Sequence, residues 1–442
     1  MGKLILAIIV FIIGFCSIKR PWLGIVTYYL LALLGPQYIW WWIFGDLRVT
    51  LIIAICTILG LIYKYLRKEL DFEFLKNKLN FWLFLLWVSL DISYLFGPYV
   101  DHFSRGGLSP IQLFSMTNNI YCFYFVAILV VNDLKGLRYL GLIFVITTLY
   151  MVYWANTQYF TANWSMFEQG RLTGPRDVLG GAIYRDENTL ALLFVTGIPF
   201  LFYFAFELLQ RWQRYLLLCV IPLGWHAIFL TGSRGGLLGL GVVTVLLALK
   251  SKSNNKRLLI PLLLASFVLA FQFQGGNTMK ERSEKISGYE GDKSAENRLT
   301  AWEGGLNMVM AHPVTGVGLG SFVTALPDFI ESRHMVAHNT FVQFSAESGV
   351  IAGLAYLMIV WTFIKNSLLI NAFCRDSSDS QEILQIERYN NASTVSFIGL
   401  IVCSLFLSLN NYEIFFFLLI FNNVLAQLCL KDTNIQSESF YT

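Results

Sequence analysis

Three arginines in this 442-residue chain have the chemistry needed to bind a diphosphate. Arg171 opens RLTGPRDVLGG, Arg234 lies within TGSRGG, and Arg298 begins RLTAWEGG. A guanidinium group keeps its charge at physiological pH and donates two parallel hydrogen bonds to phosphate oxygens. These arginines are therefore candidate ligands of a diphosphate, and a lipid-linked diphosphate is the natural class in so apolar a chain.

One histidine, His338 in MVAHNTFVQF, is the candidate base. An unperturbed imidazole titrates near pH 6.5, so a neutral ring that accepts a proton is available at neutral pH. Asn339 follows directly, and Glu347 shares a helix face with Asn339 or Gln343 by i, i+4 spacing. We expect Asn339 and Glu347 to bind substrate or to orient the site. The alternative for His338 is a structural role at the start of the next helix.

Other cofactor and partner classes have no support in the sequence. There is no P-loop, and TGVGLG follows no predicted strand, so no dinucleotide fingerprint is present. No Cys/His cluster or acidic pair has the spacing of metal ligands, so we expect neither a metal nor another cofactor. The net charge of +4 reflects the loops of a membrane protein, and no nucleic-acid partner is expected.

The elements that position these residues must be membrane helices. Hydrophobic residues make up 56% of the chain and charged residues only 14%, which predicts an all-α polytopic membrane protein. The apolar runs predict about 12 spans, and no cleavage site for a signal peptide follows the first run. The runs lie near residues 4–16, 22–44, 48–64, 80–97, 117–132, 137–157, 187–207, 213–230, 234–250, 257–273, 340–367, 393–409 and 413–430.

Lysine and arginine in the loops predict the orientation of the bundle. Basic loops at 64–78, 133–138, 211–214 and 250–257 are predicted to be cytoplasmic. By alternation, loops 98–116, 158–186, 231–234 and 274–339 face the opposite side, the periplasm of a Gram-negative cell. The chain then divides into membrane helices with their outer loop over 1–273, a long periplasmic loop over 274–339, C-terminal membrane helices over 340–430 and a cytoplasmic tail over 431–442.

Charged residues near the membrane need partners. The turn that carries Arg234 is so short that its guanidinium lies at or inside the membrane edge, where it either meets a protein carboxylate or awaits an anionic ligand. For Arg298, a solvated helix face is the alternative to ligand binding. Asp91 lies in the outer part of a predicted span, and we expect it to pair with an arginine.

The long loop 274–339 contains one amphipathic segment. Apolar residues recur at helical spacing from Arg298 to Ala311, until Pro313 ends the pattern; they are Leu299, Trp302, Leu306, Val309 and Met310. We expect a helix lying on the membrane surface. Three glycines then alternate in GVGLG, which predicts either a plain turn or a tight connection where the backbone approaches a ligand.

Several motifs together resemble the O-antigen ligase and polymerase superfamily of bacterial membrane glycosyltransferases. They are RLTG followed by DEN, TGSRGG, NRLTAWEGGLNMVMAHPVTGVGLGSF and AHNTFVQFSAESGVIAG, in this order over residues 171–353. The opening, IKRPWLGIVTYYLLALLGPQ, is more loosely similar to glycosylation ligases associated with exosortase systems. The resemblance implies a GT-C-type helical fold. It also implies an undecaprenyl-diphosphate-linked glycan donor, used without nucleotide sugar or metal.

The resemblance also assigns roles to residues. The diphosphate-binding arginines of the family fall on Arg171 and Arg234, and its functional histidine falls on His338. Where many relatives have a proline-containing turn, this chain has Asp186, Glu187 and Asn188, which leaves the role of Glu187 open. His338 would accept the proton of the attacking hydroxyl, with inversion at the anomeric carbon.

Three functions follow as hypotheses. A ligase would transfer the glycan at the periplasmic face of the bacterial inner membrane to lipid A core, protein or another glycan acceptor. A polymerase would use the same site with a second lipid-linked repeat as acceptor. A transporter is the alternative of another class, although it should show interrupted helices in paired repeats and polar residues at mid-membrane depth.

Overall fold

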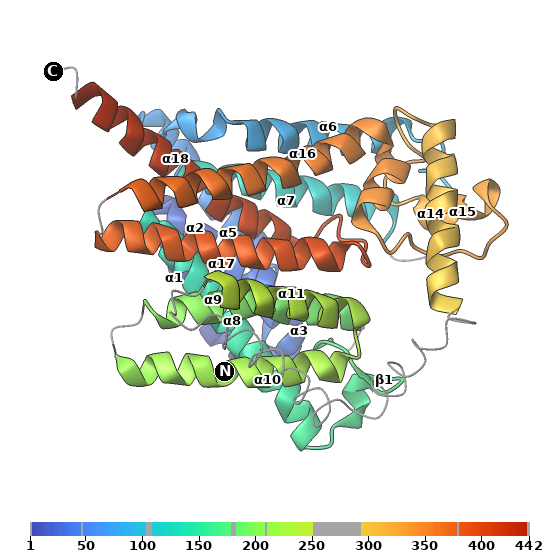
Figure 1. Ribbon diagram of the computed structural model, residues 1–442, viewed down its shortest axis with the longest axis horizontal. Coiled ribbons are helices and arrows are strands. Elements are labelled where there is room, and N and C mark those ends of the chain that lie inside the picture. The colour runs from blue at the N-terminus through green and yellow to red at the C-terminus, as the bar shows by residue number, and fades with distance from the viewer. Residues whose placement is uncertain are drawn as a thin grey trace.

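The computed structural model describes most of the chain (Figure 1). The described residues are 2–45, 47–102, 108–177, 183–207, 210–250, 293–377 and 380–439. They form a helical bundle that carries one short hairpin, which confirms the predicted fold class of an all-α polytopic membrane protein. The predicted run 257–273 lies outside the described residues.

The helices follow one another with few other elements. They are α1 (Gly2–Lys19), α2 (Pro21–Leu34), α3 (Pro36–Ile39), α4 (Trp41–Phe44), α5 (Val49–Leu66), α6 (Lys78–Phe96), α7 (Pro110–Val130), α8 (Leu134–Phe160), α9 (Glu187–Ala205), α10 (Arg211–Thr231), α11 (Arg234–Lys250), α14 (Lys293–Ala311), α15 (Phe322–Phe329), α16 (Thr340–Asp376), α17 (Gln381–Ser404) and α18 (Glu413–Ser439). Two short 3₁₀ helices, Phe72–Leu75 and Trp164–Met166, and the strands β1 (Phe167–Glu168) and β2 (Arg171–Leu172) complete the set.

Nine helices among the described residues are long and apolar enough to cross a membrane. They are α1, α5, α6, α7, α8, α9, α10, α16 and α18. The described residues contain fewer such helices than the predicted number of about 12, because some apolar runs form shorter or more polar helices. Gly35, with φ +63°, ends α2 after 14 residues. α11 has 17 residues, and α17 contains the buried polar residues Asn390 and Asn391.

α9 lies at the centre of the bundle and begins at the candidate site. Almost all of its residues from Leu190 to Ala205 are buried, and it packs against α8, α10, α11 and α17. A helix that is apolar on every side is stable only when other helices surround it. The position of its first residue, Glu187, is therefore fixed by packing along the whole helix.

α14 lies crosswise at the end of the bundle where α11 and α16 begin (Figure 1). The helix predicted from Arg298 to Ala311 is thus present as part of α14. Ala301 and Met308 face the bundle in a small core with residues of α15, whereas Leu299, Leu306 and Met310 are exposed. An exposed apolar row of this kind suits a helix that rests on a membrane surface.

The glycine-rich segment after α14 fills a break in α16. Gly349 interrupts α16 with φ +83° and ψ 177°. The amides of Val317 and Gly318 donate to the carbonyls of Ala346 and Glu347 at 2.9 and 3.0 Å, and the Val350 amide donates to the Pro313 carbonyl at 2.9 Å. The glycines are therefore a tight connection, and the backbone that they approach is that of α16.

Replacing Gly349 should destabilise the protein. A Cβ atom there would lie 2.3 Å from the Val314 carbonyl oxygen, and the positive φ disfavours any other residue. We expect Gly349→Ala to lower the free energy of unfolding in detergent by about 1–3 kcal/mol or more. Gly241→Ala, in α11, is the matched control, since a Cβ there meets nothing within 4 Å. Equal unfolding free energies for the two variants would contradict this account.

Candidate active site

The start of α9 is the point from which the candidate site is built. The Asp186 side chain caps the helix by accepting hydrogen bonds from the amides of Asn188 and Thr189 at 2.9 and 3.2 Å. This cap places Glu187 and Asn188 in the first turn of α9. The DEN sequence, whose role was left open, is thus a helix start, and its positive dipole end favours negatively charged groups.

Arg171 is held against this helix start. It belongs to β2, which pairs with β1 across the turn residues Gln169 and Gly170, both with positive φ as a tight hairpin turn requires. The Arg171 guanidinium forms an ion pair with the Glu187 carboxylate, and both side chains are mostly buried, with 22% and 18% exposed. The Nε atom of Arg171 is buried without a hydrogen-bond partner among the described residues.

The turn that precedes Arg234 is fastened to Asn188, the next residue of α9. Arg234 is the first residue of α11, directly after Ser233. The Ser233 hydroxyl donates to the Asn188 side-chain oxygen at 2.7 Å and accepts from the Gly236 amide at 3.0 Å. Arg171 and the turn before Arg234 are thus anchored through consecutive residues, Glu187 and Asn188. The convergence of Arg171 and Arg234 on one ligand cavity stays a prediction.

The backbone around His338 is held from both sides. The Trp302 indole of α14 donates to the Ala337 carbonyl at 2.8 Å, and the Ala337 amide donates to the Gln343 side-chain oxygen at 3.3 Å. His338 itself has φ +50°, an uncommon conformation for a residue other than glycine. Asn339, not His338, caps α16, because its side chain accepts a hydrogen bond from the Val342 amide at 3.1 Å.

The electrostatic surroundings of His338 identify its neighbours. Burial and the positive charge of Arg298 lower the pKa of the His338 imidazole below its usual value, whereas the negative charge of Glu187 raises it. His338 therefore shares its surroundings with the carboxylate that binds Arg171. Among the residues that the structure describes, no hydrogen bond of the imidazole ring occurs.

Arg298 faces the site from α14. It precedes Trp302 by one helical turn, so both lie on the side of the helix that contacts the His338 segment. Its guanidinium carbon lies 5.7 Å from the centre of the Phe406 ring. Arg298 is half-buried, which favours a role in the site over the alternative of a solvated helix face.

Glu347 acts on the site indirectly. Its side chain is buried, and its carboxylate accepts hydrogen bonds from the Gln343 amide group at 2.6 Å, the Phe322 backbone amide at 3.3 Å and the Asn410 side chain at 3.3 Å. The expected i, i+4 contact between Gln343 and Glu347 is confirmed. Because the Gln343 side-chain oxygen also accepts a hydrogen bond from the Ala337 amide, Gln343 links Glu347 to the His338 segment.

The prediction for Asp91 is wrong. Its carboxylate accepts a hydrogen bond from the Asn118 side chain at 3.0 Å, and within the described ranges it forms no ion pair with an arginine. Asn118 in turn accepts from the Trp87 indole at 2.9 Å. The neighbouring helix α7 presents an amide at this level of the bundle, so the carboxylate is satisfied without a cation.

Sequence reasoning did not assign roles to Glu187, Trp302 and Gln343. For Glu187 the signal was present, since an acidic residue directly after an aspartate cap is typical of a first helical turn. Trp302 and Gln343 act through side-chain contacts with Ala337, and no spacing along the chain predicts those contacts.

The site combines cations, one carboxylate and one imidazole at helix ends. Such a set can bind an anion through Arg171, Arg234 and Arg298 and can take up a proton at His338. In the described part of the chain, no group of three or more His, Cys, Asp or Glu side chains is arranged to hold a metal ion.

Two protein families match parts of this chain. Residues 1–97 match a family of unknown function, so the looser resemblance of the opening to exosortase-associated ligases stays a prediction. No curated protein matches the chain. Residues 217–357 match the family described as O-Antigen ligase, and this segment contains Arg234, Arg298 and His338, whereas Arg171 precedes it. Through this segment the chain is similar to O-antigen ligases, which supports the resemblance of its motifs to that superfamily.

Proposed function

We propose that this protein is a membrane glycosyltransferase that moves a glycan from an undecaprenyl-diphosphate carrier to an acceptor on the periplasmic side of the bacterial inner membrane. The proposal is supported by the ion pair between Arg171 and Glu187 and by the influence of Glu187 and Arg298 on His338, in a chain whose segment 217–357 matches O-antigen ligases. Lipid A core, a protein or another glycan would be the acceptor, and the donor lipid would lie among the membrane helices.

The arginines would bind the diphosphate of the donor. Arg171 is now paired with Glu187, and its buried Nε has no hydrogen-bond partner among the described residues, so this donor is available for a phosphate oxygen. Arg234 begins α11, whose positive dipole end adds to the attraction. These groups would stabilise the negative charge that grows on the diphosphate as it leaves.

His338 would act as the general base. The acceptor hydroxyl gives its proton to the imidazole while its oxygen forms a bond to the anomeric carbon of the donor sugar. The bond from that carbon to the diphosphate oxygen breaks, and the electron pair leaves with the lipid diphosphate. A single displacement of this kind inverts the configuration at the anomeric carbon.

A polymerase remains the second candidate, since its acceptor would be another lipid-linked glycan at the same site. A transporter is disfavoured by the position of the charged groups. Arg171, Arg234 and His338 all lie at or before the first turns of helices, at one end of the bundle, whereas a transport site needs polar groups at mid-membrane depth.

Arg171→Lys should reduce glycan transfer. Lysine keeps the charge but loses the planar pair of donors, so we expect turnover to fall about 10- to 100-fold in purified, lipid-reconstituted protein. The matched control is Arg176→Lys, five residues later, whose guanidinium pairs with Glu168 and is not part of the site. Equal turnover of both variants and the parent would remove the basis for a diphosphate clamp.

His338→Gln should lose activity without losing donor binding. An amide keeps hydrogen-bonding capacity but is not a base near neutral pH, so the rate should fall about 10²- to 10⁴-fold. His334→Gln serves as a control, since His334 is exposed and its Nδ1 contacts the Val323 carbonyl oxygen at 2.8 Å. Near-normal transfer by His338→Gln would leave His338 with a structural role only.

The pH profile of the parent tests the same base. The neutral imidazole is the active form, so the rate should rise with pH and level off above the His338 pKa. Because burial and Arg298 lower that pKa, the midpoint should lie below the usual 6.5. Arg298→Gln removes one of these effects and should move the midpoint upward. An unchanged midpoint would show that Arg298 does not act on the titrating group.

The glycan profile of a deletion strain should separate ligase from polymerase. Loss of all long glycan chains on the acceptor, with accumulation of carrier-linked glycan, is the result expected for a ligase. Products that carry a single repeat would instead identify a polymerase. An unchanged profile of both carrier-linked and transferred glycan would contradict both functions.

A further inference from the structure

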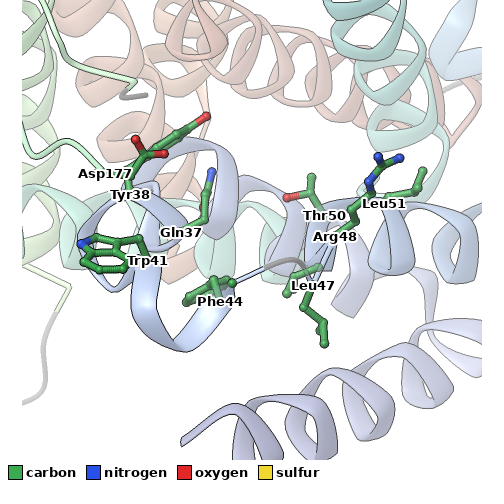
Figure 2. A pocket seen from close by; sticks show the side chains of 11 residues that line it. Gln37, Tyr38, Trp41, Phe44, Leu47, Arg48, Thr50, Leu51 and Asp177 are labelled. Atoms are coloured by element: carbon green, nitrogen blue, oxygen red, sulfur yellow. The ribbon is translucent and has the colours of Figure 1, made fainter. Parts of the chain in front are cut away.

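Three adjoining cavities lie beside the candidate active site. The first, of about 560 Å³, lies between α3, α4, the start of α5 and Asp177 (Figure 2). The second, of about 620 Å³, lies between α2, α5, α7 and the start of α18, and the third, of about 270 Å³, lies between α7, α16 and residues 408–412. Thr50 and Leu51 line both the first and the second, and Met116 lines both the second and the third. The cavities therefore form a row.

The third cavity of the row lies beside the site, and the first lies against the segment that follows Arg171. Thr189, Gln343 and Glu347 line the third cavity; Thr189 is in the first turn of α9, and Gln343 links Glu347 to the His338 segment. Asp177, in the first cavity, belongs to the same loop as Arg171. The Tyr184 hydroxyl fastens the end of this loop to α2 by donating to the Leu33 carbonyl at 2.5 Å.

Each cavity has one residue in its wall with a buried oxygen that lacks a hydrogen-bond partner within the described ranges. These oxygens are Gln37 Oε1 in the first cavity, Glu413 Oε2 in the second and Asn410 Oδ1 in the third. A buried polar atom without a partner is costly; Gln37 Oε1 and Asn410 Oδ1 are amide acceptors, and Glu413 Oε2 belongs to a carboxyl group. Because these oxygens are buried within the wall, their side chains must turn toward the cavity to meet a ligand, and a hydroxyl group, which both donates and accepts, suits all three. A lipid chain has no donors, and a phosphate group offers acceptors.

The first cavity has the mixed lining that a sugar ring needs. In Figure 2 the polar ends of Tyr38, Gln37, Arg48 and Asp177 lie along one edge, and the ring of Trp41 lies along the other. Burial, and then the Asp177 carboxylate, raise the pKa of the Tyr38 hydroxyl, so this group stays a hydrogen-bonding phenol. Because Arg48 and Asp177 carry opposite charges, the lining suits a polyhydroxylated ligand better than an ion of one sign.

We propose that the three cavities form one groove that binds the sugar chain of a glycan next to the reacting sugar, with Gln37 and Asn410 accepting hydrogen bonds from its hydroxyls and the Glu413 carboxyl group forming a hydrogen bond with another hydroxyl. This inference rests on the proposed function, because it assigns the groove to a glycan of the transfer reaction. The glycan is either that of the donor or that of the acceptor, whose sugars share this chemistry. It gives a role to residues of the segment 1–97, whose family has no known function.

The test compares two adjacent tryptophans. Trp41 lines the first cavity, whereas Trp42 does not and is 54% exposed. If both served only as membrane anchors, Trp41→Ala and Trp42→Ala would behave alike. We expect Trp41→Ala and Gln37→Met each to raise KM about 3- to 10-fold, with kcat little changed and Trp42→Ala like the parent.

The substrates are the lipid-linked glycan pool and the acceptor membranes of a deletion strain. A raised KM for the lipid-linked glycan assigns the groove to the donor, and a raised KM for the membranes assigns it to the acceptor. KM values of Trp41→Ala and Gln37→Met equal to that of Trp42→Ala would overturn the groove. Should Trp41→Ala not fold, Gln37→Met alone decides.

A binding experiment separates the groove from the proposed function. Free glycan, released from the lipid-linked pool by mild acid, carries no diphosphate. We expect calorimetric titration to show that it binds the parent protein, and that its affinity for Gln37→Met is about 3- to 10-fold lower. Equal binding by the two, or no binding by the parent, overturns the groove even if Arg171→Lys has impaired transfer. Weaker binding of the free glycan by Gln37→Met supports the groove, whatever the effect of Arg171→Lys on transfer. If Arg171→Lys transfers glycan like the parent, only the diphosphate site is refuted.

Discussion

Backbone groups inside a membrane must find hydrogen-bond partners within the protein, and this constraint organises the functional end of the bundle. α16 breaks at Gly349, which leaves the carbonyls of Ala346 and Glu347 without their helical donors. The amides of the glycine-rich segment take these places. Because that segment directly follows α14, the hydrogen bonds that complete α16 also fix the position of α14. Glu347 then joins the break to Gln343 and, through it, to the backbone beside His338.

The charged residues obey a related rule. A charge near hydrocarbon is tolerated when it lies at a helix end and has a partner. The first turn of α9 provides two such partners. Glu187 forms an ion pair with Arg171, and Asn188 accepts a hydrogen bond from Ser233 in the turn before Arg234. α9 is buried along its length, so the cations are placed by the packing of the whole bundle rather than by their own loops. A short hairpin and a tight turn are sufficient to present them.

Part of this arrangement could be predicted from the sequence. Apolar runs predicted the membrane helices, and the spacing of Trp302, Leu306 and Val309 predicted α14, because these patterns are local. The roles proposed for Arg171 and His338 come from their motifs and stay predictions. Other contacts join residues that are distant along the chain: Asn118 donates a hydrogen bond to Asp91, and Trp302 donates one to the Ala337 carbonyl. No periodicity encodes them. The row of cavities is likewise invisible in the sequence, since its walls come from helices spread over the whole chain.

α14 carries two kinds of contact on one rigid rod. Leu299, Leu306 and Met310 are exposed, and the charge of Arg298 acts on His338. If the exposed row rests on lipid, α14 lies at a fixed height relative to the bilayer surface. The helix would then also fix the distance between the His338 imidazole and that surface. An attacking hydroxyl would react only when its own anchor holds it at the height of the imidazole, so the length of the spacer between that hydroxyl and the membrane would itself select the acceptor.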